Sequence, residues 1–379
     1  MLASTPPTPP SQGLSTQATL LERVLQIAQT PAPTFHEGER SSLIAGWWAG
    51  FGLHPELDAA GNIIARIGPR FPSLAGVPTR RICLAAHLDT VFDANTDLRV
   101  RHEGNRLVGP GVGDNASSLA VLTSFAERVA ISGAPCELWL AATTGEEGLG
   151  DLKGAKHLLT AHAQDFDAFI AVDGYLGLVV DRSVGVRRYR VSFHAEGGHS
   201  WGNAGAPSAI QALGDAIHDL YKIPLVQDPR ATLNVGTVSG GTSVNSIASS
   251  AEMLLDLRSI DASTLEHLED SARSVLTRVA RRSRVELRLT PVGDRPAGET
   301  DNQALVRASQ QALEHLKLGM RRVASSTDAN AAVPHRLPAI AFGVYRGGNA
   351  HRLDEWIEPE SLEPGLYALE ALVQQLARN

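Results

Sequence analysis

The chain has 379 residues, of which 34 are Lys or Arg and 41 are Asp or Glu, and its formal net charge is −7. This length suggests two or three domains of about 150 residues each, and the lack of a basic block disfavours nucleic acid as a partner. No apolar run approaches the roughly 20 residues that span a bilayer, so no membrane partner is expected. Cys83 and Cys136 lie in apolar, strand-like runs, which indicates core cysteines and fits a reducing, cytoplasmic location.

The N-terminal part begins with a segment that lacks the features of a targeting signal. Residues 1–16 have neither a charged start nor an apolar core, and we expect a disordered tail. Apolar residues at helical spacing from Leu20 to Ala28 then predict a helix. Thr34 and Glu37 have the spacing of a capping box, which predicts a second helix carrying Trp47 and Trp48.

Several apolar runs have the length of strands buried on both faces, and polar residues follow them. These runs alternate with helical patterns, of which residues 119–129 are the clearest. The alternation predicts an α/β fold with a mainly parallel sheet and helices on both faces. The predicted strands are residues 82–86, 138–143, 168–172 and 339–344, and a closing helix is predicted at 366–376.

The pattern changes in residues 183–295, where strands with one polar face are expected. Their order with two amphipathic helices is βαββαβ, which predicts an inserted two-layer α+β domain of ferredoxin-like type. Residues 17–182 and 296–379 would then form the catalytic domain around this insertion. The inserted elements are expected at residues 188–195, 209–220, 233–238, 251–257, 265–279 and 285–289.

Polar residues at the ends of the buried strands are the candidate functional groups. Ligands bind at the carboxyl edge of open α/β sheets, where these residues would gather. Two imidazoles and several carboxylates suit zinc, with manganese or cobalt possible, better than calcium. Because one ion needs fewer carboxylates than this, we expect two ions about 3.5 to 4 Å apart, bridged by a carboxylate. The residues are His87, Asp89, Asp114, Glu146, Glu147, Asp173 and His351.

The adjacent acids Glu146 and Glu147 point in different directions if the backbone is extended. One can therefore bind metal while the other takes a proton from metal-bound water and later delivers it to a leaving amine. Such a pair performs amide hydrolysis without a covalent intermediate.

Five motifs follow one another along nearly the whole chain after the tail: Ala86–Thr90 (AHLDT), Gly111–Asn115 (GVGDN), Thr144–Gly148 (TGEEG), Val172–Gly174 (VDG) and Ala350–His351. In this order they resemble the aminoacylase, glutamate carboxypeptidase and tripeptidase family of co-catalytic zinc hydrolases. The resemblance implies that one Zn²⁺ is held by His87, Asp114 and Asp173, and the other by Asp114, Glu147 and His351. It also implies that Glu146 is the general base acting on a metal-bridging water, that Asp89 orients His87, and that the peptide bond between Asp114 and Asn115 is cis.

The inserted domain is similar to the lid and dimerisation domain of that family, which implies a homodimer. His199 in Gly197–Ser200 is similar to a histidine that stabilises the oxyanion, often in the partner's site. Asn245 and Arg258 are similar to lid residues that bind a substrate carboxylate. The simpler alternatives are a loop histidine at 199 and an ion pair between Arg258 and Asp256. Residues 326–330 resemble another active-site segment, to which no role is assigned.

The expected reaction is hydrolysis of an amide bond in a small peptide or an N-acyl amino acid with a free carboxylate. Whether the protein is an exopeptidase or a deacylase stays open, although Asp173 favours the di- and tripeptidase branch.

Two other motifs predict different functions. Gly198–Gly202 matches the G-x-S-x-G elbow of a serine hydrolase with Ser200 as nucleophile, but the residues after it do not predict the required helix. Gly111–Ala116 matches a relaxed nucleotide-binding fingerprint, but an aspartate occupies the place of the pyrophosphate. A metal-binding relative without catalysis is a further alternative, although it would be expected to lack a general base such as Glu146.

Overall fold

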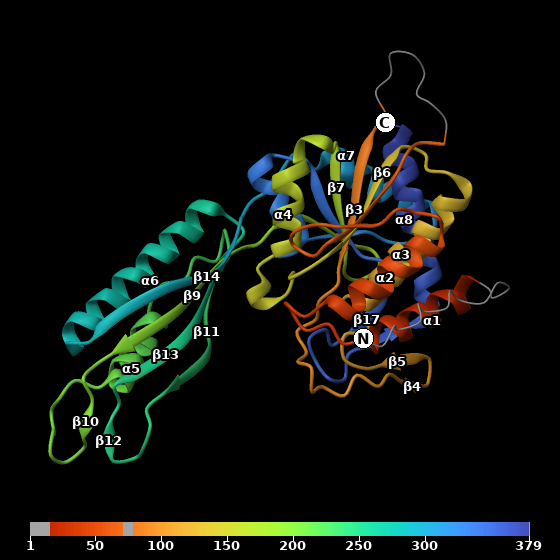
Figure 1. The fold of residues 1–379 in the computed structure, drawn as a ribbon. Coiled ribbons are helices and arrows are strands. Elements are labelled where there is room, and N and C mark those ends of the chain that lie inside the picture. Colours follow the sequence, from red (N-terminus) through yellow and green to blue (C-terminus); the bar gives the residue numbers. More distant parts are fainter. Residues whose placement is uncertain (1–15, 71–78, 379) are drawn as a thin grey trace. The chain divides into compact units, whose positions relative to one another are not determined.

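The computed structural model describes residues 16–70 and 79–378. The chain divides into two compact units (Figure 1): unit 1 runs up to Ser183 and resumes at Glu299, and unit 2 is Val184–Gly298. The tail predicted at 1–16 lies outside the described residues except at Thr16, where the first helix begins. Among the residues described, no helix combines the length and apolarity needed to cross a bilayer.

The centre of unit 1 is an eight-stranded sheet in its described part. The four strands in the middle, β6, β3, β7 and β16, run parallel. At one edge β1 is antiparallel to β2 and β2 to β6, whereas at the other edge β8 is antiparallel to β16 and β15 is parallel to β8. The predicted mainly parallel α/β sheet is therefore confirmed at its centre. In spatial order the strands are β1 (Glu56–Leu57), β2 (Ile63–Ile67), β6 (Glu137–Thr143), β3 (Arg81–His87), β7 (Ala168–Val172), β16 (Ala339–Phe342), β8 (Leu178–Ser183) and β15 (Arg321–Ser325).

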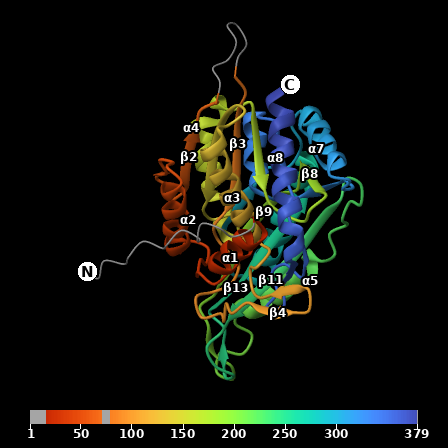
Figure 2. The same cartoon turned by 90° about the vertical axis from the view of Figure 1, so that its right-hand side faces the viewer.

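Helices bury both faces of this sheet, which explains why its strands are apolar on both sides. On β3, Ile82, Leu84 and Ala86 belong to one core, whereas Cys83 and Ala85 belong to the other. The α3 and α8 helices lie side by side over the first core (Figure 2). The first core is covered by α1 (Thr16–Ala28), α2 (Gly38–Gly50), α3 (Ala116–Ser132), α7 (Gln303–His315) and α8 (Leu362–Arg378), and the second by α4 (Lys153–His162) and the 3-10 helix η3 (Asp328–His335).

A small four-stranded sheet in unit 1 escaped the sequence patterns because each of its strands has only three residues. It joins two segments that are distant in the sequence, since β18 pairs with β5. Its strands, in spatial order, are β17 (Arg346–Gly348), β18 (Trp356–Glu358), β5 (Arg106–Val108) and β4 (Arg101–Glu103).

Unit 2 is an antiparallel sheet with two helices on one face. Apolar side chains from alternate strand positions, such as Val191 and Phe193, pack against these helices. Asp261 caps the second helix by accepting a hydrogen bond from the amide of Thr264. The strands, in spatial order, are β11 (Ala231–Gly240), β13 (Ser250–Ser259), β9 (Gly185–His194) and β14 (Glu286–Arg295); the helices are α5 (Ala209–Leu220) and α6 (Ala262–Ser283). A separate ribbon pairs β10 (Gly198–His199) with β12 (Ser246–Ile247).

Candidate metal centre

The candidate ligands come from the carboxyl ends of the central strands and from two loops. His87 is the last residue of β3, Glu147 follows β6, and Asp173 follows β7 directly. Because these strands are parallel neighbours, their carboxyl ends meet at one edge of the sheet. Asp114 comes from the loop before α3, and His351 from the loop between β17 and β18.

Asp114 lies between the two histidines. Its Oδ1 is 3.1 Å from Nε2 of His87, and its Oδ2 is 3.1 Å from Nε2 of His351. Nε2 of His351 is also 3.0 Å from Oε1 of Glu147. The peptide bond between Asp114 and Asn115 is cis, as the sequence resemblance predicts.

Three groups of potential ligand atoms each lie within 4.8 Å of one another, and two of these groups share Asp114. The two groups that share Asp114 match the two ligand sets implied by the sequence resemblance. The third group contains both Glu146 and Glu147. Residues up to 264 positions apart in the sequence thus converge around one bridging carboxylate. The groups are His87, Asp114 and Asp173; Asp114, Glu147 and His351; and His87, Glu146 and Glu147.

The electrostatics of this cluster fit a pair of divalent cations. Hydrogen bonds to Asp114 and Glu147 raise the pKa of His351 to about 11. Burial raises the pKa of Asp173 to about 7, and the neighbouring charge of Asp114 adds to this shift. Carboxylates and imidazoles that could bind cations are thus concentrated in one place. A mixed set of imidazole and carboxylate ligands is suited to Zn²⁺, Mn²⁺ or Co²⁺.

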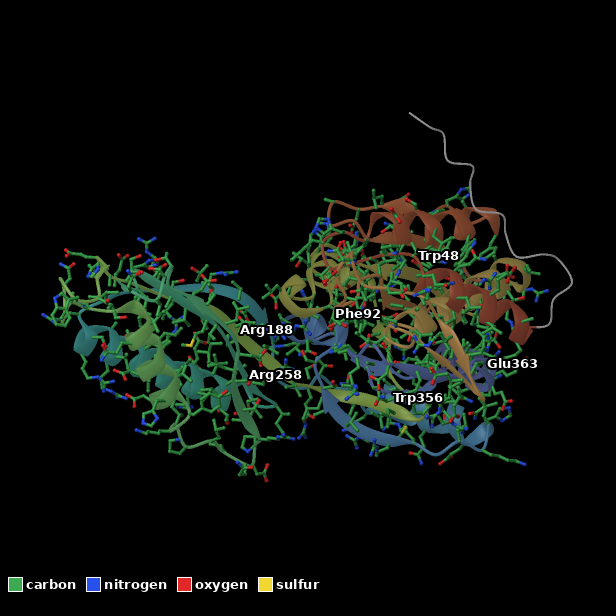
Figure 3. All side chains as sticks on the ribbon, turned by 90° about the horizontal axis from the view of Figure 1, so that it is seen from below. Trp48, Phe92, Arg188, Arg258, Trp356 and Glu363 are labelled. Atoms are coloured by element: carbon green, nitrogen blue, oxygen red, sulfur yellow. The ribbon has the colours of Figure 1, made fainter. Side chains whose placement is uncertain are left out.

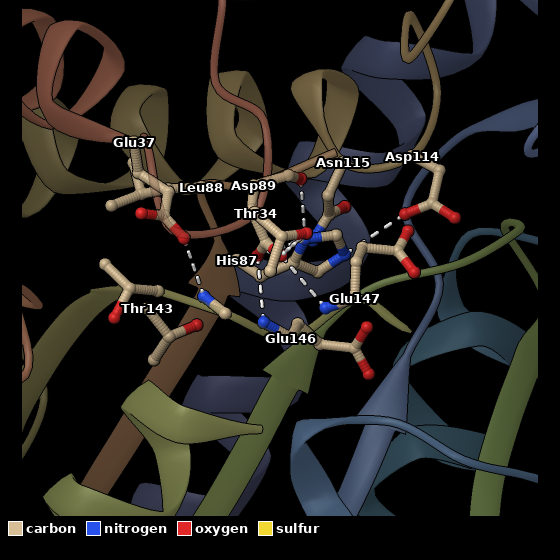
Figure 4. Close-up of polar contacts among 12 residues, drawn as sticks. Thr34, Glu37, His87, Leu88, Asp89, Asp114, Asn115, Thr143, Glu146 and Glu147 are labelled. Atoms are coloured by element: carbon tan, nitrogen blue, oxygen red, sulfur yellow. Dashed lines mark hydrogen bonds and ion pairs between the residues drawn. The ribbon is translucent and has the colours of Figure 1, made fainter. Parts of the chain in front are cut away.

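Asp89 organises the groups behind the cluster (Figure 4). Its two carboxylate oxygens accept hydrogen bonds from the amides of Glu146 and Glu147, each at 2.9 Å. Oδ1 also lies 3.6 Å from Nδ1 of His87, and Nδ1 is 3.1 Å from the Asp89 main-chain oxygen. Burial alone would raise the pKa of Asp89, but His87 and the two amides hold it below its ordinary value. Asp89 therefore aligns the β3 and β6 ends with each other.

The predicted capping box at Thr34 and Glu37 is wrong, because both side chains contact the candidate site instead (Figure 4). Glu37 occupies the N-cap position of α2, but no side-chain capping bond forms there. Thr34 Oγ1 donates to Asp89 Oδ2 at 2.9 Å, and Glu37 Oε1 accepts from the amide of Gly145 at 3.0 Å. The spacing of these residues could not reveal partners that lie 55 and 108 positions away.

Two further buried acids support the site, and the sequence did not assign a role to either. Asp328, in the segment 326–330, accepts a hydrogen bond from Oγ1 of Thr143 at 2.6 Å. Thr143 is the last residue of β6, so this bond fixes the strand end from which Glu146 and Glu147 follow. Glu355 accepts from the amide of Asp114 at 2.7 Å. Burial raises the pKa of Glu355 to about 8, with a further contribution from the charge of Asp114.

In unit 2, the structure places His199 and Asn245 on neighbouring segments of the exposed β10–β12 ribbon. The amide of Ser200 donates to the main-chain oxygen of Asn245 at 3.0 Å, and Nδ1 of His199 accepts from the amide of Trp201 at 3.2 Å. The serine-hydrolase alternative does not fit this local structure, because α5 begins only at Ala209 and no helix opens directly after Ser200.

Arg258 lies on β13 and forms an ion pair with Asp256, which is the simpler of the two interpretations of this arginine. Its Nε is 2.6 Å from Oδ1 of Asp256, and Nε of Arg188 is 2.8 Å from Oδ2 of the same carboxylate. Figure 3 labels both arginines on the sheet of unit 2. A role of Arg258 in binding a substrate carboxylate therefore stays a prediction.

Comparison with known proteins identifies the family. Residues 83–375 match the profile of "Peptidase family M20/M25/M40". The chain belongs to this family. An acetylornithine deacetylase from Edwardsiella ictaluri is 26% identical over 360 residues, which cover 89% of this chain and 91% of the relative.

Solved structures with the same fold include M20 peptidases. A tripeptidase from Staphylococcus aureus is 21% identical, with a TM-score of 0.78 and coverage of 97% of this chain and 100% of that one. A dinuclear metal-binding peptidase from Bacillus subtilis is 16% identical, with a TM-score of 0.68 and coverage of 96% and 98%. At these identities the likeness establishes a shared fold.

Proposed function

We propose that this M20 family member is a two-cation hydrolase that cleaves an amide bond in a small peptide or an N-acyl amino acid with a free carboxylate. The observation that carries the proposal is the pair of ligand groups sharing Asp114, with Glu146 next to the ligand Glu147. The family membership and the activities of the relatives, a deacetylase and a tripeptidase, support hydrolysis of amide bonds.

The proposed mechanism assigns proton transfer to Glu146. Two divalent cations, when bound, supply the Lewis acidity that polarises the scissile carbonyl and acidifies water. The Glu146 carboxylate takes a proton from the attacking water, and it returns this proton to the amine nitrogen as the carbon–nitrogen bond breaks. Asp89 keeps the main chain at Glu146 and Glu147 in place, so that one acid binds while its neighbour transfers protons.

Unit 2 has a proposed role as the lid and dimerisation domain. His199 is the proposed donor to the oxyanion of the transition state, and Asn245 and Arg258 are proposed to bind the substrate carboxylate. For Arg258 this requires exchange of its partner, because Asp256 holds the guanidinium in the absence of substrate. A planar guanidinium can make this exchange, since it binds any carboxylate through two parallel donors.

A substrate screen with a matched pair of variants tests the proposal. The metal-loaded chain is assayed on dipeptides, tripeptides and N-acetyl amino acids, including N-acetylornithine. We expect Glu146→Ala to lower kcat by about 100-fold or more while its metal content stays at the wild-type level. Glu56→Ala, which removes an exposed acid of β1, should leave kcat unchanged. Full activity of Glu146→Ala would remove this residue as the general base, and no turnover of any of these substrates by wild type would refute the proposed substrate class.

A further inference from the structure

Glu355 makes an unusual set of contacts with the loop that carries Asp114. Its side chain is buried, with 1% of the residue exposed. Oε2 accepts from the amide of Gly111 at 2.9 Å, and Oε1 accepts from the amides of Gly113 at 3.1 Å and Asp114 at 2.7 Å. The main-chain oxygen of Glu355 accepts from the amide of Gly109 at 2.9 Å. One residue thus fixes most of the loop from Gly109 to Asp114.

Glu355 also belongs to the loop that carries His351. The amide of Glu355 donates to the main-chain oxygen of Arg352 at 3.1 Å, which closes this loop just before β18 begins at Trp356. Trp356 pairs with Val108 of β5, directly before the Asp114 loop. Glu355 therefore links two segments whose ligands are 237 positions apart in the sequence.

The approach of Glu355 to the loop requires a glycine at position 113. A Cβ atom on Gly113 would lie 2.6 Å from Oε1 of Glu355 and 2.7 Å from Cε2 of Tyr345. Both neighbours are buried, so neither can move aside without disturbing the hydrogen bonds. The glycine at position 113 therefore allows the Glu355 carboxylate to approach the amides of this loop.

We propose that Glu355 is a positioning residue that sets the separation of Asp114 and His351, and so forms the cation site of Asp114, Glu147 and His351. This inference rests on the proposed two-cation function. The other site shares Asp114 but depends less on Glu355, because its two further ligands are held by the large sheet: His87 ends β3, and the amide of Asp173 donates to the main-chain oxygen of Phe342 at 3.1 Å. Loss of Glu355 should therefore weaken one of the two cation sites selectively.

Stepwise titration of the metal-free full chain with Co²⁺, followed by absorbance, measures the two sites separately. In Glu355→Gln the side-chain nitrogen replaces one acceptor oxygen and leaves an amide of the loop without its partner. We expect one of the two equivalents to lose affinity by about 10- to 100-fold, as is typical of groups that orient metal ligands. The other equivalent should change by less than about threefold. Gly113→Ala should give the same selective loss, and Glu360→Gln, at an exposed acid nearby, should bind like wild type.

Three results would overturn the inference. Unchanged binding of both equivalents in Glu355→Gln would show that the contact does not position a ligand. An equal loss of both equivalents, or failure of both Glu355→Gln and Gly113→Ala to fold by circular dichroism, would indicate a general structural role. A wild-type chain that binds fewer than two equivalents would refute the proposed function itself, and the role of Glu355 with it.

Discussion

The buried guanidinium of Arg40 donates a hydrogen bond from Nη1 to the main-chain oxygen of Leu88 at 2.7 Å. Leu88 lies between His87 and Asp89, so this hydrogen bond fixes the main chain that carries both side chains. Nη2 of Arg40 also donates to the main-chain oxygen of Thr30 at 2.9 Å. Burial lowers the pKa of Arg40 to about 10, opposed by the charge of Asp89.

Replacing Arg40 with Met should destabilise the protein strongly. The change leaves buried carbonyl oxygens without donors and Asp89 without a nearby cation, and each kind of loss is costly in an apolar interior. We expect the free energy of unfolding to fall by about 2 to 4 kcal/mol in urea titrations. Arg99→Met removes an arginine from a fully exposed ion pair and should leave the urea midpoint unchanged. Equal midpoints for the two variants would contradict a structural role for Arg40.

Glu37 should affect turnover through the turn that bears Glu146. Oε1 of Glu37 accepts from the amides of Gly145 and Phe35, each at 3.0 Å. In Glu37→Ala these amides lose their acceptor, and we expect kcat to fall by about tenfold because misplacement of a catalytic group is costly. Glu37→Gln keeps one acceptor oxygen and should retain most of the activity, and Glu39→Ala, at an exposed position of α2, serves as the control. The role would be excluded if Ala and Gln at position 37 gave the same kcat as wild type.

The patterns that the sequence predicted correctly are those imposed by burial over several residues. The run predicted at 82–86 lies within β3 (Arg81–His87) and the run at 168–172 is β7, because strands covered on both faces must be apolar throughout. The candidate ligands His87, Glu147 and Asp173 could be predicted for a related reason, since parallel strands deliver the residues at their carboxyl ends to one edge. Asp114 and His351 lie on loops and were predicted from the motifs that contain them.

What the sequence could not predict depends on single contacts between distant residues. The strands β5 and β18 have three residues each, which is too few to show periodicity. The small sheet that brings Glu355 to the Asp114 loop could therefore not be predicted from the sequence. Glu37 has a spacing suited to helix capping, yet its carboxylate bonds to Gly145, 108 positions away. The sequence showed that Asp256 is close enough to pair with Arg258. It could not show whether Arg258 binds Asp256 or a substrate carboxylate.

The ion pairs of Asp256 in unit 2 predict a specific dependence of stability on pH. Burial alone would raise the pKa of Asp256, but Arg258 and Arg188 hold it below its ordinary value. The stability that these pairs add is therefore fully present above the unfolded pKa of about 3.9, and it is lost as pH falls through the lower folded pKa.

Asp256→Asn should accordingly destabilise the protein at pH 7, and its difference from wild type should shrink below about pH 4. Urea titrations at a series of pH values measure this difference. Asp270→Asn, at an exposed position of α6, should show no such trend. Wild-type and Asp256→Asn curves that run parallel across the whole pH range would contradict the prediction.

Removal of divalent cations should lower the melting temperature. Asp114, Glu147 and Asp173 gather as potential ligands only in the folded chain, and a cation that binds only the folded state stabilises it. At a free cation concentration of 1,000 times Kd the gain is about 4 kcal/mol. We expect EDTA to lower Tm of the loaded wild type and Zn²⁺ to restore it, with most of this response lost in Asp114→Asn. A Tm that is the same with EDTA and with Zn²⁺ would count against cation binding.

Anomalous scattering from crystals of the zinc-loaded protein shows whether two cations share the carboxylate of Asp114. We expect two anomalous peaks per chain at the zinc edge, one among His87, Asp114 and Asp173 and one among Asp114, Glu147 and His351. A single peak, or peaks at other residues, would contradict this expectation.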